Sequence, residues 1–255
     1  MMRAFFIGLQ FLTRISIVRQ DQWTAEDFGR SVKWFPLIGA VLGAIYAAFA
    51  YAFYSWLPAR GIVLPPHLTA AVLLILPPLM TGGLHCDGFM DTMDGVFSGR
   101  SRERMLEIMK DSCTGSNAVF CFVVLMFVEF AVLLDMPKNV VVPAVFVMPI
   151  VARLMMVVGI ALFPYARPDG LGKAFAQYAG RSTVWFASLC TLALILPLGR
   201  LAWISLPVSA AFTMFFANYV QKRLGGLTGD VYGAIATLNE GLVLLTFLSG
   251  ASIMK

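Results

Sequence analysis

Long runs without a charged side chain constrain this sequence more than any other feature. Residues 34–59 lie between Lys33 and Arg60 and contain no Asp, Glu, Lys or Arg. About 20 apolar residues are enough for a helix to cross a lipid bilayer, so a run of this length predicts a membrane span. Comparable runs predict seven spans, at about 34–59, 67–83, 114–134, 140–163, 182–199, 201–221 and 231–252.

The composition agrees with a membrane fold. Charged residues make up 13% of the 255 residues, whereas about 25% is usual in a soluble domain, so the surplus apolar surface must face lipid. We therefore expect an all-α fold, a polytopic membrane helical bundle that forms one catalytic domain over residues 1–255. Arg3 and Arg14 interrupt the first 18 residues, which predicts an interfacial or re-entrant segment there.

Basic residues are distributed unevenly between the two ends of these spans. Of nineteen Lys and Arg residues, only Arg60, Lys138, Arg200 and Lys255 fall on the side opposite the N-terminus, and Arg153 falls inside a span. Because cytoplasmic loops carry the excess of Lys and Arg, we expect a multi-pass protein of the cell inner membrane whose polar loops face the cytoplasm. The net charge of +5 then reflects topology and anionic lipid rather than nucleic acid.

The longest inner loop, about 84–113, carries three aspartates in a helical register. Asp87, Asp91 and Asp94 follow one another at i, i+4 and i+7, which places them within about 60° of one helix face. Carboxylates so aligned repel one another, and a hard cation such as Mg²⁺ or Mn²⁺ relieves that repulsion. We predict that all three are metal-binding and catalytic residues. The alternative is a solvated acidic helix start that the helix dipole favours.

A basic segment follows the aspartates. Arg104 and Lys110 lie within residues 100–111, where apolar side chains alternate with charged ones. Arg and Lys both bind phosphate, so we predict that these two residues contact substrate. The same pattern is equally typical of an interfacial amphipathic helix whose basic residues meet lipid headgroups.

Two glycine-containing inner loops also indicate a ligand. Arg167 lies in the loop 164–173, and Asp230 lies in the loop 225–230, directly before the last span. Glycines let the backbone approach a ligand closely, and helix N-termini attract phosphate. We predict that Arg167 and Asp230 bind substrate, with a plain N-cap as the alternative for Asp230.

Charges within spans are costly in lipid and require an explanation. Arg153 and Glu240 each lie about ten residues from the inner end of a span, hence about 15 Å deep. We predict either that they pair or that both line a polar cavity below the active site, where Arg153 would contribute to substrate binding. A structural ion pair between two helices is the alternative. Glu129 lies nearer the outer face, and the sequence indicates no partner for it.

Several of these segments resemble one known family. The stretch from Gly82 to Gly95, followed by residues 107–112, is similar to the signature of the cobalamin synthase family, adenosylcobinamide-GDP ribazoletransferase. The resemblance continues in order along nearly the whole chain, in Leu9-Gln10-Phe11-Leu12-Thr13-Arg14, Phe35-Pro36-Leu37-Ile38-Gly39, Pro164-Tyr165-Ala166-Arg167 and Gly226-Leu227-Thr228-Gly229-Asp230. Cys86 departs from the apolar or acidic residue that the family often has there.

The resemblance implies a multi-pass inner-membrane transferase that uses Mg²⁺. Such an enzyme joins adenosylcobinamide-GDP to α-ribazole, or to α-ribazole 5'-phosphate, and releases GMP in the last assembly step of cobalamin. The aspartates at 87, 91 and 94 match those of the family. Our hypothesis places Mg²⁺ on Asp87 and Asp91, assigns Asp94 as general base, and gives Lys110, Arg104 and Arg167 the phosphate oxygens.

Two other readings compete with this one. A CDP-alcohol phosphotransferase also carries aspartates on membrane helices, but its signature continues Asp-Gly-x-x-Ala-Arg, whereas this chain has Asp91-Thr92 in place of Ala-Arg. A transporter would also show charges in spans and broken helices. Transporter halves are commonly related by a repeat, and this sequence shows none.

Overall fold

The computed structural model describes residues 2–18 and 23–253, and this part of the chain is almost entirely helical. Short 3-10 and π turns extend some helices, notably after α3, where Ala52–Trp56 and Pro58–Arg60 carry the chain on to the next loop. The α-helices are α1 (Met2–Leu12), α2 (Ala25–Ser31), α3 (Phe35–Tyr51), α4 (Pro66–Thr81), α5 (Leu84–Val96), α6 (Arg102–Ile108), α7 (Ser116–Asp135), α8 (Lys138–Leu162), α9 (Leu171–Tyr178), α10 (Arg181–Ile195), α11 (Arg200–Leu224) and α12 (Gly229–Ile253).

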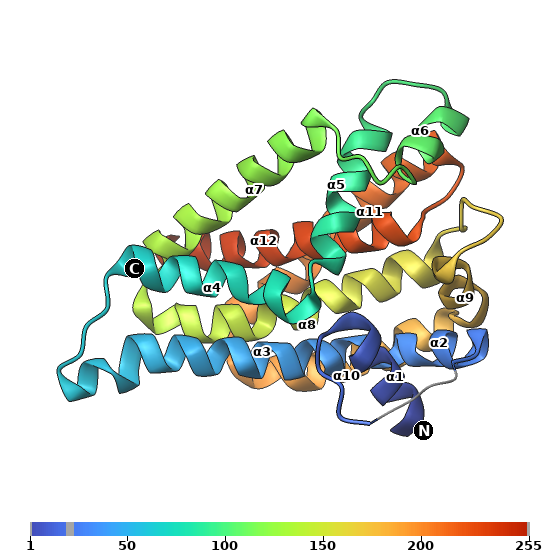
Figure 1. Cartoon of the computed structure of the whole chain (residues 1–255). Coiled ribbons are helices and arrows are strands. Elements are labelled where there is room, and N and C mark those ends of the chain that lie inside the picture. The colour runs from blue at the N-terminus through green and yellow to red at the C-terminus, as the bar shows by residue number, and fades with distance from the viewer. Residues whose placement is uncertain (1, 19–22, 254–255) are drawn as a thin grey trace.

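The predicted spans are confirmed as a helical membrane bundle (Figure 1). Six helical stretches within the described residues are long and apolar enough to cross a membrane, and the bent pair α4–α5 would make a seventh. α4 has 16 residues and is about 24 Å long, somewhat less than the hydrocarbon core of a bilayer. At 11 residues, α1 is too short to span, in keeping with the predicted N-terminal segment.

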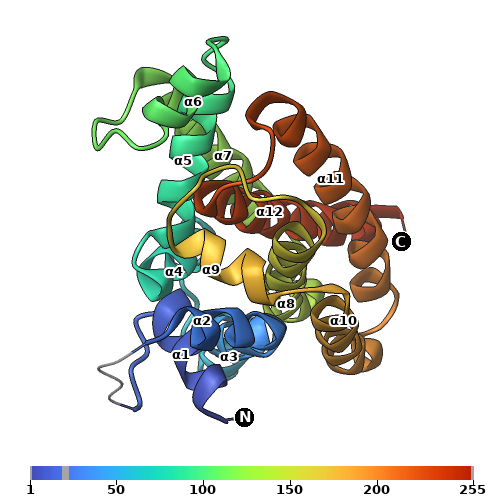
Figure 2. The same cartoon turned by 90° about the vertical axis from the view of Figure 1, so that its right-hand side faces the viewer.

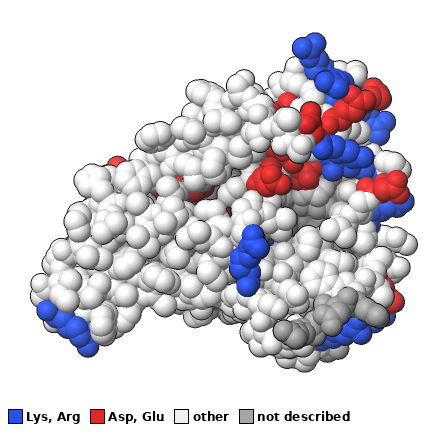
Figure 3. Space-filling view, viewed as in Figure 1, with Lys and Arg blue, Asp and Glu red and all other residues white. Residues whose placement is uncertain are grey.

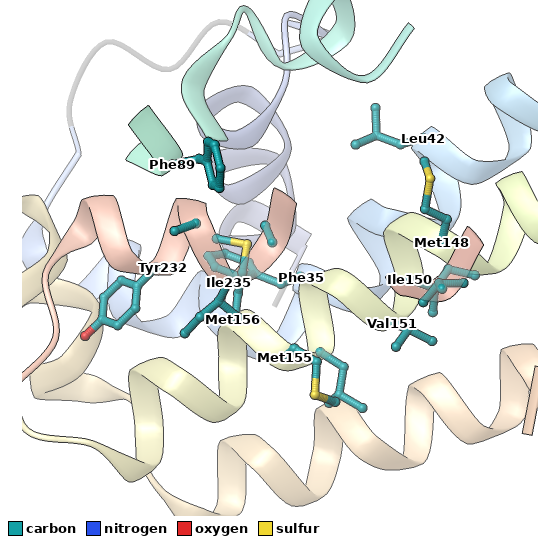
Figure 4. Close-up of a cluster of buried hydrophobic side chains, with 14 of the residues drawn as sticks. Phe35, Leu42, Phe89, Met148, Ile150, Val151, Met155, Met156, Tyr232 and Ile235 are labelled. Atoms are coloured by element: carbon teal, nitrogen blue, oxygen red, sulfur yellow. The ribbon is translucent and has the colours of Figure 1, made fainter. Parts of the chain in front are cut away.

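Helix α8 lies at the centre of the bundle between α3 and α12. Its side chains are buried along most of its length, and Figure 4 shows Met148, Ile150, Val151, Met155 and Met156 of α8 among residues of α3, α5 and α12. Two small residues explain the close approach of α3. A Cβ on Gly39 would lie 2.5 Å from the Pro149 carbonyl oxygen, and one on Gly43 would collide with the Phe146 carbonyl. Small residues at this spacing are typical of helix pairs in membranes.

The outer helices turn large apolar side chains outward. Phe127 on α7, Trp185 on α10 and Phe215 on α11 are each about 70% exposed or more. Water disfavours so much exposed apolar area, whereas lipid accepts it. These surfaces are therefore the lipid-facing side of a multi-pass membrane protein.

Charged side chains gather at one end of the bundle, which we call the polar end (Figure 3). This end carries α2, α6 and α9 together with the end of α1 and the start of α12 (Figures 1 and 2). The alternating directions of the spans place Arg60, Lys138 and Arg200 at the opposite end. Lys255 lies outside the described residues.

Candidate active site

The aspartate helix α5 lies across the bundle rather than along it. Its axis makes an angle of 91° with α4, and Figure 1 shows α5 running across the direction of α4. The bend occurs at Gly82 and Gly83, whose φ angles are +64° and +78°, a backbone conformation that glycine adopts without strain. The Gly83 amide donates to the Pro78 carbonyl at 2.8 Å and so closes the end of α4.

A backbone-to-backbone crossing fixes α5 against the first turns of α12. A Cβ on Gly88 would lie 2.7 Å from the Asp230 carbonyl oxygen, and one on Gly233 would lie 3.3 Å from the Gly88 Cα. No larger side chain fits between these two helices. The crossing brings the carboxylates of α5 close to Asp230, although the sequence separates them by more than 130 residues.

Asp91 lies close to several other carboxylates, those of Asp87, Asp94 and Asp230. It is half-buried, and its pKa is raised to about 7, first by burial and then by the charges of Asp230 and Asp87, while Arg167 opposes the shift. Burial and the two neighbouring carboxylates both disfavour the charged form of Asp91, and a bound cation would relieve the repulsion between the carboxylates. The structure thus supports the clustering of Asp87 and Asp91 and adds Asp230 to them.

Asp230 is held by an arginine and a hydroxyl. The Arg167 guanidinium lies 2.8 Å from the Asp230 carboxylate and also donates to the Met109 carbonyl at 3.3 Å. The Thr228 hydroxyl donates to Asp230 at 3.2 Å. Sequence analysis quoted Thr228 only within a motif and missed its contact with Asp230, although a Thr directly before a helix is a common N-cap, and the Thr228 hydroxyl does accept the Val231 amide at 3.3 Å.

The two glycine-containing loops are joined to each other, which is why Arg167 reaches Asp230. The Ala166 amide donates to the Leu227 carbonyl, and the Leu227 amide donates to the Pro164 carbonyl, both at 2.8 Å. A Cβ on Gly226 would lie 2.6 Å from the Pro164 carbonyl oxygen, so this glycine allows the loops to touch. The two loops therefore lie side by side next to Asp230, a contact that the sequence did not predict.

Asp94 has a different environment from the other two aspartates. Its carboxylate accepts hydrogen bonds from the backbone amides of Gly115 and Ala118, the latter at 2.8 Å. These amides open α7, where unpaired N–H groups need an acceptor. Asp94 thus caps α7 from outside and connects it to α5. Its predicted roles as metal ligand and general base stay predictions.

The remaining predicted residues lie away from this cluster. Arg104 pairs with Glu107 at 2.9 Å on the exposed face of α6, and Lys110 is exposed just after that helix. Arg153 is fully buried and pairs with Glu240, so the ion pair predicted from their equal depth is present. Glu129, for which the sequence indicated no partner, lies against Gly241 next to that pair.

Two hollows meet at Asp87. One is a cavity of about 150 Å³ lined by Asp87, Asp230 and aromatic residues that include Phe35 and Phe175. The other is a larger groove of about 690 Å³ between the end of α1 and the α4–α5 bend. Sequence analysis did not predict that Gln10 and Arg14 line a groove beside Asp87. The available signal was Arg14, a charge that interrupts an otherwise apolar segment.

The carboxylates of the site fit the predicted Mg²⁺ if substrate phosphates complete its coordination. Within residues 2–18 and 23–253, no three His, Cys, Asp or Glu side chains converge to hold an ion by themselves. Mg²⁺ is commonly held by one or two carboxylates together with substrate phosphates and water. Asp87 and Asp91 fit that arrangement, because they follow each other on one face of α5 and Asp87 lines both hollows.

Known proteins align with this chain over almost its whole length. It is 40% identical to the adenosylcobinamide-GDP ribazoletransferase of Desulfitobacterium hafniense over 252 residues, which cover 96% of both chains. It is 31% identical to the protein of the same name from Clostridium acetobutylicum over 250 residues, covering 96% of this chain and 95% of that one. No solved structure matches it. The family model described as cobalamin-5-phosphate synthase matches residues 4–248, and the chain belongs to that family.

Proposed function

We propose that this protein is an adenosylcobinamide-GDP ribazoletransferase. It joins adenosylcobinamide-GDP to α-ribazole, or to α-ribazole 5'-phosphate, and releases GMP in the last assembly step of cobalamin. The match of residues 4–248 to the family and the shared name of relatives that align along almost their full length support this assignment. The observation that carries it is the helix α5, whose Asp87 lines both hollows and whose Asp91 lies within the electrostatic reach of Asp87 and Asp230.

The proposed reaction is attack by a free ribose hydroxyl of the acceptor on the phosphorus that is joined to cobinamide, with GMP as the leaving group. Because the 5' oxygen of α-ribazole 5'-phosphate already carries phosphate, the attacking hydroxyl common to both acceptors lies at another position of the ribose. Asp87 and Asp91 would hold Mg²⁺, which neutralises charge on the pyrophosphate. Arg167 is kept in place by Asp230 and Met109, and its buried Nε has no partner among the described residues. That N–H is the donor we assign to a phosphate oxygen. Arg104 on the exposed face of α6 and Lys110 just after that helix would contact phosphate oxygens of the substrate.

Asp94 has two candidate roles, positioning α5 and acting as general base, and its contacts favour the first. Both of its oxygens accept amides at the start of α7, which supports a role in positioning α5. A carboxylate so occupied is a weaker candidate for general base, because the lone pairs that would take the proton are engaged.

The orientation in the membrane is part of the proposal. The basic residues concentrate at the polar end of the bundle, and cytoplasmic surfaces carry that excess. We infer that the polar end faces the cytoplasm from the cell inner membrane, where the water-soluble nucleotide substrate is available.

The test is a turnover assay on the purified protein in nanodiscs. Adenosylcobinamide-GDP and either acceptor are supplied with Mg²⁺ or with EDTA, and corrinoid product and nucleotide are separated by chromatography. We expect metal-dependent product and one GMP per turnover, both lost in Asp91→Asn. A folded protein that forms no corrinoid product with either acceptor would overturn the assignment, and release of CMP from a CDP-alcohol would replace it.

A further inference from the structure

The groove of about 690 Å³ beside Asp87 has an arginine on its rim. It is enclosed by the end of α1, the α4–α5 bend and the start of α7, and its lining includes Gln10, Arg14, Gly82, Asp87 and Phe122. Neither the spacing of the aspartates nor the glycine-containing loops pointed to this side of α5. The groove and the smaller cavity share Asp87, so a ligand in the groove reaches the reacting centre.

The backbone and a glycine hold Arg14 over the bend. Its amide donates to the Met80 carbonyl at 2.7 Å, which attaches the segment after α1 to the end of α4. Its guanidinium lies directly over Gly82, with Cζ 2.7 Å from the position that a Cβ would occupy. Gly82 therefore serves the bend and also leaves room for the guanidinium.

Arg14 is a basic side chain in the lining of the groove that no acidic side chain of the described residues engages. Its side chain is exposed and forms no ion pair within the described part of the chain. Other arginines of the polar end are engaged: Arg167 with Asp230, and Arg102 with the Leu224 carbonyl at 2.7 Å. A guanidinium with free donors binds phosphate oxygens in pairs.

A second polar group in the same groove also lacks a partner. The Gln10 Oε1 atom is buried and has no hydrogen bond within the described residues. A buried carbonyl oxygen without a donor is costly, and a ribose hydroxyl or a base N–H would satisfy it. Phe122 and Phe11 add aromatic surface to the walls, which suits a nucleobase.

We propose that this groove binds the guanosine nucleotide of the donor substrate, with Arg14 on a phosphate and Gln10 on a hydroxyl or N–H of the nucleoside. The proposal rests on the proposed function and deepens it, because it locates the leaving nucleotide on the α1 side of Asp87. The phosphate chemistry has a second source, a lipid headgroup, since Arg14 lies close to the lipid-facing helices.

The test compares Arg14→Ala, Arg14→Lys and Gln10→Ala with Arg181→Ala, an exposed arginine of the polar end that does not line the groove. GDP binding with Mg²⁺ is measured by calorimetry on protein in neutral-lipid nanodiscs, and the Michaelis constants of donor and acceptor are measured separately. Thermal unfolding confirms that each variant is folded. We expect Arg14→Ala to weaken GDP binding about ten- to a hundredfold, as loss of a charge-assisted hydrogen bond does. The Michaelis constant for the donor should rise in parallel, with that for the acceptor and kcat within about twofold.

The control and conservative variants sharpen this result. Arg14→Lys should recover part of the GDP affinity, Gln10→Ala should weaken it about fivefold, and Arg181→Ala should leave it unchanged. Unchanged GDP affinity in Arg14→Ala, or a rise confined to the acceptor constant, overturns the proposal. A defect of Arg14→Ala that appears only in nanodiscs containing anionic lipid assigns the guanidinium to a headgroup and also overturns it.

Failure of the proposed function gives a different signature. If the wild-type protein binds GDP through Arg14 but forms no corrinoid product, the groove proposal stands and the proposed function is wrong. If the wild-type protein forms the product and the Arg14→Ala variant binds GDP normally, the proposed function stands and the groove proposal is wrong.

Discussion

Replacing Glu240 by Gln should destabilise the protein strongly. Arg153 is fully buried, and the Glu240 side chain that pairs with it is 9% exposed. The Arg153 Nε and Nη2 atoms have no other partner within the described residues, so Glu240 is the group that compensates this charge. Removing one partner of a buried ion pair costs about 3–5 kcal/mol, because the remaining charge stays buried without compensation. The measurement is the free energy of unfolding in lipid bicelles, by titration with a denaturing detergent.

Glu129→Gln is the matched control for this change. It removes a carboxylate that lies against Gly241, next to Glu240, but that does not pair with Arg153, so its cost should stay below about 1 kcal/mol. The double variant Arg153→Met with Glu240→Leu should unfold within about 1 kcal/mol of the wild type, since apolar pairs replace buried ion pairs well. A Glu240→Gln protein within about 0.5 kcal/mol of the wild type, or a double variant as unstable as the single one, would refute the reasoning.

Four further outcomes follow from the site and the core. Asp91→Asn should lower turnover about 100-fold or more, as loss of a pre-organised charge does, with an unchanged melting temperature; a smaller loss would remove Asp91 from the centre. Because the pKa of Asp91 is about 7 without metal, a proton competes with Mg²⁺ there, so calorimetric Mg²⁺ affinity should rise about tenfold per pH unit below 7 and level off above it. Asp94→Asn should cost about 1 kcal/mol of stability through the α7 cap and leave Mg²⁺ affinity within twofold; the reverse pattern would return Asp94 to the metal. Gly43→Leu should cost about 1–3 kcal/mol by overpacking against α8, measured as above, whereas a neutral result would mean that α3 does not approach α8 this closely.

Two kinds of feature were predictable from the sequence: the length of each span and the depth of a charged residue within its span. The spans follow from runs of apolar residues long enough to cross a bilayer, and α7, α8, α10, α11 and α12 begin and end close to the expected residues. The span expected at 34–59 begins as α3, which ends at Tyr51, and π and 3-10 turns continue it to Arg60. Arg153 and Glu240 were expected to meet because each lies about ten residues from the same end of its span. A charge in lipid has few ways to be compensated, so equal depth was a sufficient signal.

Features that depend on contacts between helices could not be predicted in the same way. The pair Gly82-Gly83 indicates a break, but the 91° angle arises because α5 packs on α12 through Gly88 and Gly233. That crossing decides that Asp230 faces Asp91, and it has no local pattern in the sequence. Asp94 was grouped with its neighbours by spacing, and only the return of the chain to α7, more than 20 residues later, supplies the amides that occupy it.

The right-angle bend also bears on how the membrane voltage acts on the site. Seven residues separate Asp87 from Asp94, a rise of about 10 Å along a helix. On a helix continuing α4, that rise would run through the membrane, and a charge moving along it would cross part of the transmembrane potential. Because α4 runs along the bundle with the other spans (Figure 1) and α5 lies at 91° to it, these carboxylates are expected at nearly one depth, where a charge passing between them crosses little of the field. Turnover in proteoliposomes should therefore be indifferent to an imposed potential, and the enzyme can work unchanged whether the cell is energised or not.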